Sequence, residues 1–145
     1  MLVSSEASEF ADDLRRIFGD LDRMTGGGLT GECSPPVDVY ETDASVEIAV
    51  DLPGIDPALV RVIAKGSTII IAGEKAPRRA RMDSTFHLVE RGYGRFARAI
   101  RLTTACDARR AHAGVRNGEL RISLPKVIER RGTTIRVPVA PGEMQ

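Results

Sequence analysis

The sequence is poor in aromatic residues: they make up 4% of 145 residues, and tryptophan is absent. Proteins that bind single-stranded nucleic acid without sequence preference stack the bases on aromatic side chains, and this chain offers few. The formal net charge is only +1, so no bulk field attracts nucleic acid or an anionic membrane. We therefore expect neither nucleic acid nor a membrane surface as a partner.

Cysteine is equally scarce. Cys33 and Cys106 lie far apart in the chain and form no CxxC motif, which predicts free thiols in a reducing compartment. His87 and His112 do not stand at metal-ligand spacing from them, so no metal site is expected. The N-terminus has no basic stretch followed by an apolar run, and no segment is apolar enough to span a membrane. These absences predict a cytoplasmic protein without a metal or cofactor.

The motifs of common enzymes are also missing. Gly92–Gly94 lacks the third glycine that opens a helix in a dinucleotide site, and the chain has no Gly-Lys-Ser/Thr phosphate loop. Nucleophilic catalysis needs a serine or cysteine beside a histidine and an orienting acid, whereas both histidines fit better as surface residues. Arginines between 78 and 81 could contact phosphate, but without interleaved aromatics a solvated loop is favoured. We therefore do not expect an enzyme.

Residues 1–35 are predicted to form an N-terminal arm. Apolar residues at steps of three and four indicate an amphipathic helix over about 8–24, with Ser8 as its cap and a glycine-rich linker after it. We expect this stripe to serve in client binding or assembly, although packing on its own domain is an open alternative. The stripe consists of Phe10, Leu14, Ile17, Phe18 and Leu21.

From Pro36 the apolar period changes to two. Val46–Leu52 and Val60–Ala64 alternate, the run at 68–71 is apolar on both faces, and Asn117-Gly118 predicts a type I′ hairpin turn. Short strands without helical patterns between them are typical of an all-β, immunoglobulin-like antiparallel β-sandwich. We place this domain at 36–128 and a C-terminal extension at 129–145.

Several segments in this region, in this order, resemble the small heat-shock protein or α-crystallin-domain family of the bacterial and plant type. The segments are Pro36–Glu41, Asp51–Gly54, Ile69–Glu74, Glu90–Arg98, Ala113–Leu120 and the tail tripeptide Ile135-Arg136-Val137. The resemblance implies an ATP-independent holdase chaperone that binds partly unfolded clients through apolar surface. It also implies hand-over of clients to ATP-driven chaperones.

The resemblance implies two sites of self-assembly. A strand candidate that follows a long polar loop would swap onto the sheet of a partner to form a homodimer, supported by Arg98. This predicted dimer interface comprises Phe86, His87, Leu88, Val89, Glu90, Arg91 and Arg98. Ile135 and Val137 of the tail would dock into a groove on a neighbouring dimer and build larger homo-oligomers.

Alternation along the strands favours Val62, Ala64, Ala113 and Val115 as the lining of that groove. A role for the same residues in the ordinary core is equally compatible with the pattern. The main alternative function is a monomeric cochaperone or adaptor module of the CS-domain type, and a mass measurement in solution separates the two.

Overall fold

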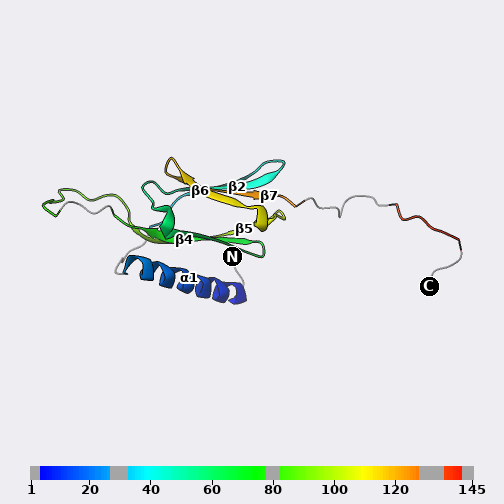
Figure 1. Ribbon diagram of the computed structural model, residues 1–145, viewed down its shortest axis with the longest axis horizontal. Helices are drawn as coiled ribbons and strands as arrows, with labels where there is room; N and C mark the ends of the chain where they lie inside the picture. Colours follow the sequence, from blue (N-terminus) through cyan, green and yellow to red (C-terminus); the bar gives the residue numbers. More distant parts are fainter. Residues whose placement is uncertain (1–3, 27–32, 78–81, 128–135, 142–145) are drawn as a thin grey trace.

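The computed structural model describes residues 4–26, 33–77, 82–127 and 136–141. Two antiparallel sheets face each other, and a helix covers the outer face of one of them (Figure 1). The four-stranded sheet has the order β1-β2-β7-β6, and the three-stranded sheet has the order β3-β4-β5. The elements are α1 (Ser4–Thr25), β1 (Val37–Glu41), β2 (Ser45–Asp51), β3 (Val60–Lys65), β4 (Thr68–Lys75), β5 (Gly94–Arg101), β6 (His112–Arg116) and β7 (Glu119–Pro125), with short 3-10 turns η1 (Pro57–Leu59) and η2 (Ala108–Arg110). The predicted all-β sandwich is confirmed.

The core forms between the sheets because alternate residues of each strand point inward. In the four-stranded sheet, Ile48 of β2 pairs with Ile122 of β7, and both side chains are about 1% exposed. Ile69, Ile71 and Phe96 close this core from the other sheet.

The central strand β4 is buried on both faces, as its apolar sequence predicts. Ile69 and Ile71 face the sandwich core, while Ile70 and Ala72 face α1. The strand continues to Lys75, beyond the predicted apolar run, and the residue before Lys75, Glu74, is a buried carboxylate.

The hairpin between β6 and β7 turns as predicted. Asn117 has φ 53° and Gly118 has φ 75°, and a type I′ turn requires positive φ at both central positions. This turn fixes the register of β6 on β7, in which Ala113 pairs with Ile122.

The N-terminal helix begins earlier than predicted, and its apolar stripe packs on a sheet. It begins at Ser4 rather than at Ser8, because Ala7 and its neighbours extend the helix and a serine is tolerated inside it. Its stripe lies on the chain's own sheet, with Ile17 and Leu21 buried against Ile70. This is the alternative that the sequence left open, and a role of the stripe in client binding or assembly stays a prediction. The outward face of β4 is as apolar as the stripe, so the two surfaces cover each other.

Candidate docking groove and assembly surfaces

An apolar groove lies where the edges of the two sheets meet. Strand β3 is the terminal strand of one sheet and β6 is the terminal strand of the other, and a cavity of about 240 Å³ opens between them. Its lining is Val62, Ala64, Ile69, Ala108, Ala111, His112, Ala113, Ile122 and Leu124. Alanines on both walls keep the groove wide, and branched core residues form its floor.

Three of the four residues predicted for the groove, Val62, Ala64 and Ala113, line this cavity. Val115 does not line it and instead packs at the margin of the main core. The reason is its position: Val115 pairs with Leu120 close to the hairpin turn, whereas the cavity lies beside the other end of β6.

Sequence reasoning missed Ala108 and Ala111, which complete the groove wall. They belong to the turn η2 and its C-cap, where the alternating pattern of the strands is interrupted. Asp107 could have indicated this turn in the sequence, because its side chain accepts a hydrogen bond from the backbone N–H of Arg109 at 3.1 Å and caps the turn.

The groove can bind an extended apolar segment. Edge strands carry backbone N–H and C=O groups that a further strand can pair with, and the floor removes apolar side chains from water. His112 is the polar side chain at the rim. The described lining is otherwise apolar, which suits the binding of an apolar segment.

The tail motif is only partly described. Ile135 lies outside the described residues. Val137 is 76% exposed and Val139 is 94% exposed, and the described tail residues 136–141 stand apart from the sandwich (Figure 1). Val137 therefore does not occupy the groove of its own chain.

The predicted strand over Phe86–Arg91 is not present in the single chain. A strand requires a hydrogen-bonded neighbour, and this segment has no place in the pairing of either sheet. All six residues are exposed, including the large apolar side chains of Phe86, Leu88 and Val89. The loop that carries them projects from one end of the sandwich (Figure 1).

Arg98 lies in β5 and is half-buried. Its Nη1 donates a hydrogen bond to the carbonyl oxygen of buried Pro35 at 3.3 Å. The contact ties the segment that leads into β1 to the edge of the three-stranded sheet, next to the Cys33 N–H bond to the Arg95 carbonyl oxygen. Its role in a dimer stays a prediction.

The two free cysteines sit in environments that disfavour the thiolate. Burial raises the pKa of the Cys33 thiol and also that of the Cys106 thiol. Since the thiolate is the reactive form, neither residue has the setting of a nucleophile. Among the described residues, no cluster of side chains suits a metal ion, and no helix is sufficiently long and apolar to pass through a membrane.

Comparison with known proteins places this geometry in a family. The model of the Hsp20/alpha crystallin family matches residues 38–140. Heat shock protein 16 of Schizosaccharomyces pombe is 35% identical over 118 residues, which cover 80% of this chain and 82% of that protein. Bacterial and plant heat-shock proteins are also among the relatives, and the match spans 64% of a Rickettsia felis protein and 60% of a Triticum aestivum protein.

Solved structures agree. Heat shock protein 16.0 from Schizosaccharomyces pombe superposes with a TM-score of 0.64 at 32% identity, covering 75% of this chain and all of that one. A small heat-shock protein from Xylella fastidiosa, described as having a distinct high-order structure, gives a TM-score of 0.59 at 30% identity, covering 79% of this chain and 97% of that one. The chain therefore belongs to the Hsp20/alpha crystallin family of small heat-shock proteins, which are chaperones and not enzymes.

Proposed function

We propose that the protein is an ATP-independent holdase of the cytoplasm that binds partly unfolded clients and prevents their aggregation. The observation that supports this most is a pair of complementary features in one chain. An apolar groove is open at the sandwich edge, and apolar side chains are exposed on the tail and on the 82–93 loop. Surfaces of this kind are typical of association sites.

The first level of assembly in this proposal is a strand-swapped homodimer. The segment Phe86–Arg91 is exposed and has no strand neighbour in its own chain, and β1 is the terminal strand of its sheet. Pairing the segment with an edge strand of a partner would satisfy both backbones and cover Phe86, Leu88 and Val89. Arg98 supports the dimer by holding the segment before β1 in place.

The second level is docking of the tail into the groove of a neighbouring dimer. Burying Ile135 and Val137 contributes roughly 1.5–3 kcal/mol for each side chain, before the entropy of ordering the tail is subtracted. A single tail contact is therefore weak. Repeated contacts within one oligomer act at high effective concentration, so the assembly holds on average while its subunits exchange.

Exchange makes apolar surface intermittently available to clients. Recognition of this type follows the hydrophobic effect and requires no directional pocket, which fits the apolar, alanine-walled groove. We further propose that bound clients pass to ATP-driven chaperones, as membership of the small heat-shock protein family suggests.

The test combines two measurements on the purified chain. Analytical ultracentrifugation should find dimers and larger homo-oligomers that exchange subunits with a labelled copy. In parallel, heat-induced aggregation of a model client such as citrate synthase should decrease without ATP as the chain is added. A strictly monomeric chain that leaves the client to precipitate would overturn the proposal and would favour the CS-domain type of adaptor.

A further inference from the structure

The sheet face beneath α1 is a second apolar surface, distinct from the groove. Its centre is formed by apolar residues of all three strands and of η1, which pack on α1: Leu59, Ile63, Ile70, Ala72 and Ala97. Basic residues border this centre on the same side of the sheet, because alternate residues point to the same face and the register aligns them. They include Arg61, Lys65 and Arg95.

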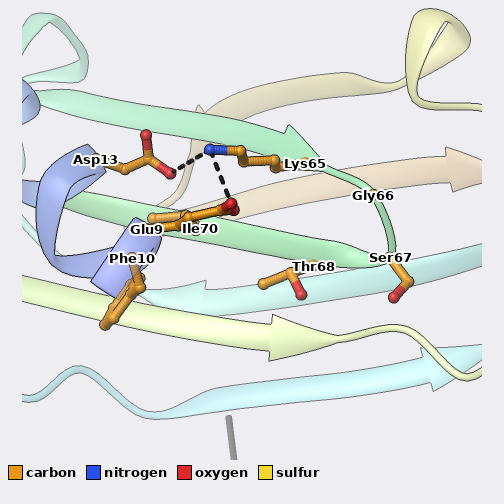
Figure 2. A pocket seen from close by; sticks show the side chains of 8 residues that line it. All are labelled: Glu9, Phe10, Asp13, Lys65, Gly66, Ser67, Thr68 and Ile70. Carbon is orange, nitrogen blue, oxygen red and sulfur yellow. Dashed lines mark hydrogen bonds and ion pairs between the residues drawn. The ribbon is translucent and has the colours of Figure 1, made fainter. Parts of the chain in front are cut away.

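The helix meets this face with acidic residues at both ends. Near its N-terminus, Lys65 Nζ lies 3.5 Å from Asp13 Oδ2 and 3.5 Å from Glu9 Oε2, with Phe10 and Ile70 beside them (Figure 2). Near its C-terminus, Asp22 Oδ1 accepts a hydrogen bond from Arg95 Nη2. The face of α1 that contacts the sheet is thus an apolar stripe with carboxylates at each end.

Two further acids of the helix, among those whose side chains are described, behave differently. Asp12 pairs with Arg15 at 3.3 Å, and Asp20 pairs with Arg23, both within the helix and on its exposed side. The helix therefore directs one set of carboxylates to the sheet and keeps another set away from it. Substitution of the acids that are paired within the helix is therefore a matched control for substitution of the acids that face the sheet.

The seat of the helix is incomplete at its N-terminal end. A cavity of about 290 Å³ lies between Phe10, Asp13, Lys65 and Ile70, and Phe10 and Leu14 are only half-buried. Close packing supplies much of the binding energy of an apolar contact, so this end is held weakly. Gly19 also lowers the intrinsic stability of the helix. Weakly packed elements of this kind open locally at a lower free energy than the core strands of a fold.

We infer that the β3–β4–β5 face beneath α1 is a client-binding surface for amphipathic segments that carry carboxylates beside an apolar stripe, and that α1 occupies it as an internal competitor. The inference rests on the proposed chaperone function and names the class of client segment. Competition follows because α1 and a client segment need the same apolar centre and the same cations. Because α1 is tethered to the sandwich, its effective concentration at this face is high, and a client segment displaces it from only a fraction of the molecules.

The probe for the test is a fluorescent peptide with the sequence of residues 4–25, titrated into the full-length chain. The substitutions Asp13→Asn and Asp22→Asn in the chain should weaken the internal helix and increase affinity for the wild-type peptide, by about two- to fivefold for each pair removed. The same substitutions in the peptide should decrease its affinity by a similar factor. Asp12→Asn with Asp20→Asn is the control and should change neither.

Asp22→Asn alone serves as the second variant, since Asp22 is partly exposed and its loss leaves the Arg95–Glu74 pair intact. Zero-length carbodiimide cross-linking then locates the peptide, with a link from peptide Asp13 or Glu9 to Lys65 expected. The inference would be overturned if the chain with Asp13→Asn and Asp22→Asn bound the peptide with the same affinity as the control chain with Asp12→Asn and Asp20→Asn. Cross-links mainly to Lys126 would overturn it as well.

Client binding at this face is tested by the heat-induced aggregation of citrate synthase in the absence of ATP. The chain with Asp13→Asn and Asp22→Asn should reach half-suppression of aggregation at a lower concentration than the control chain. Equal suppression by both chains would refute client binding at this face while leaving the holdase function intact. Failure of every chain, wild type included, would instead refute the proposed function, and the peptide titration would then report on α1 alone.

Discussion

Arg95 Nε donates a hydrogen bond to Glu74 Oε1 at 3.0 Å across the paired strands β5 and β4, and the Glu74 side chain is only 1% exposed. The same guanidinium binds Asp22 of α1 and lies 4.8 Å from the centre of the Phe18 ring. One residue thus neutralises a buried carboxylate and holds the helix on the sheet. A buried charge is tolerated only with such pairing.

Removal of this cation should destabilise the fold. Arg95→Met leaves Glu74 buried without its partner, and we expect the free energy of unfolding to fall by about 2 kcal/mol. The double variant Arg95→Met with Glu74→Met should recover most of that loss. Urea unfolding at fixed protein concentration measures both, since assembly makes stability depend on concentration. Arg121→Met, which breaks the exposed pair with Glu119, is the control and should change less than about 1 kcal/mol.

A second prediction concerns Gly73 in β4. A Cβ at this position would lie 2.4 Å from the Leu59 carbonyl oxygen and 2.8 Å from Phe96 Cζ, and neither neighbour can move freely. Gly73→Ala should therefore decrease the free energy of unfolding by about 1–3 kcal/mol. Gly19→Ala is the matched case, because its Cβ meets nothing within 4 Å and alanine favours the helix by up to about 1 kcal/mol. Destabilisation by both, or by neither, would contradict the packing described.

The tail prediction tests oligomer assembly. Ile135→Gly with Val137→Gly removes the side chains proposed to enter the groove, so ultracentrifugation should find mainly dimers. The groove side is tested separately with Ala113→Asp, which places a charge on an exposed wall position and should give the same result. A large assembly that survives both changes would show that the tail and groove do not build it.

The dimer prediction concerns the exposed loop. Leu88 is 72% exposed in the single chain, so Leu88→Asp should leave the circular dichroism spectrum unchanged while shifting the smallest stable species from dimer to monomer. Met82→Asp places the same charge in the same loop, outside the predicted interface and at a fully exposed position, and should leave the dimer intact. Dimers that tolerate Leu88→Asp would argue against strand exchange through this segment.

The last prediction is a titration. The Thr104 hydroxyl donates a hydrogen bond to Glu41 Oε1 at 2.5 Å and Lys126 Nζ lies 2.9 Å from Glu41 Oε2, and these contacts lower the pKa of Glu41. Because the folded pKa is depressed, the contribution to stability is present above the unfolded pKa and is lost as pH falls through the folded pKa. Thr104→Val should raise the Glu41 pKa measured by carboxyl NMR shifts, while Thr103→Val should not.

Much of the fold follows from local patterns. The alternation in β2 and β7, the doubly apolar run in β4 and the Asn117-Gly118 turn each predict their own structure, since burial of one face and a positive φ are requirements of the individual segment. The edges of the elements were less accurate, as the start of α1 shows, because helix ends depend on small differences in propensity.

The site was only partly predictable. Alternation identified Val62, Ala64 and Ala113 as residues of one face, yet the same pattern misplaced Val115, because distance along the groove is not encoded in a period of two. Ala108 and Ala111 were missed because a turn, rather than a strand, brings them to the wall.

The sequence by itself determined which residues seek burial and which strands they form, because those preferences act over a few neighbouring residues. Only the tertiary structure decided what each apolar surface meets. It set α1 on β4, joined Arg95 to both Glu74 and the helix, and brought β3 and β6 together at a groove. These contacts join residues far apart in the chain, and their geometry comes from the packing of two sheets, which no local pattern contains.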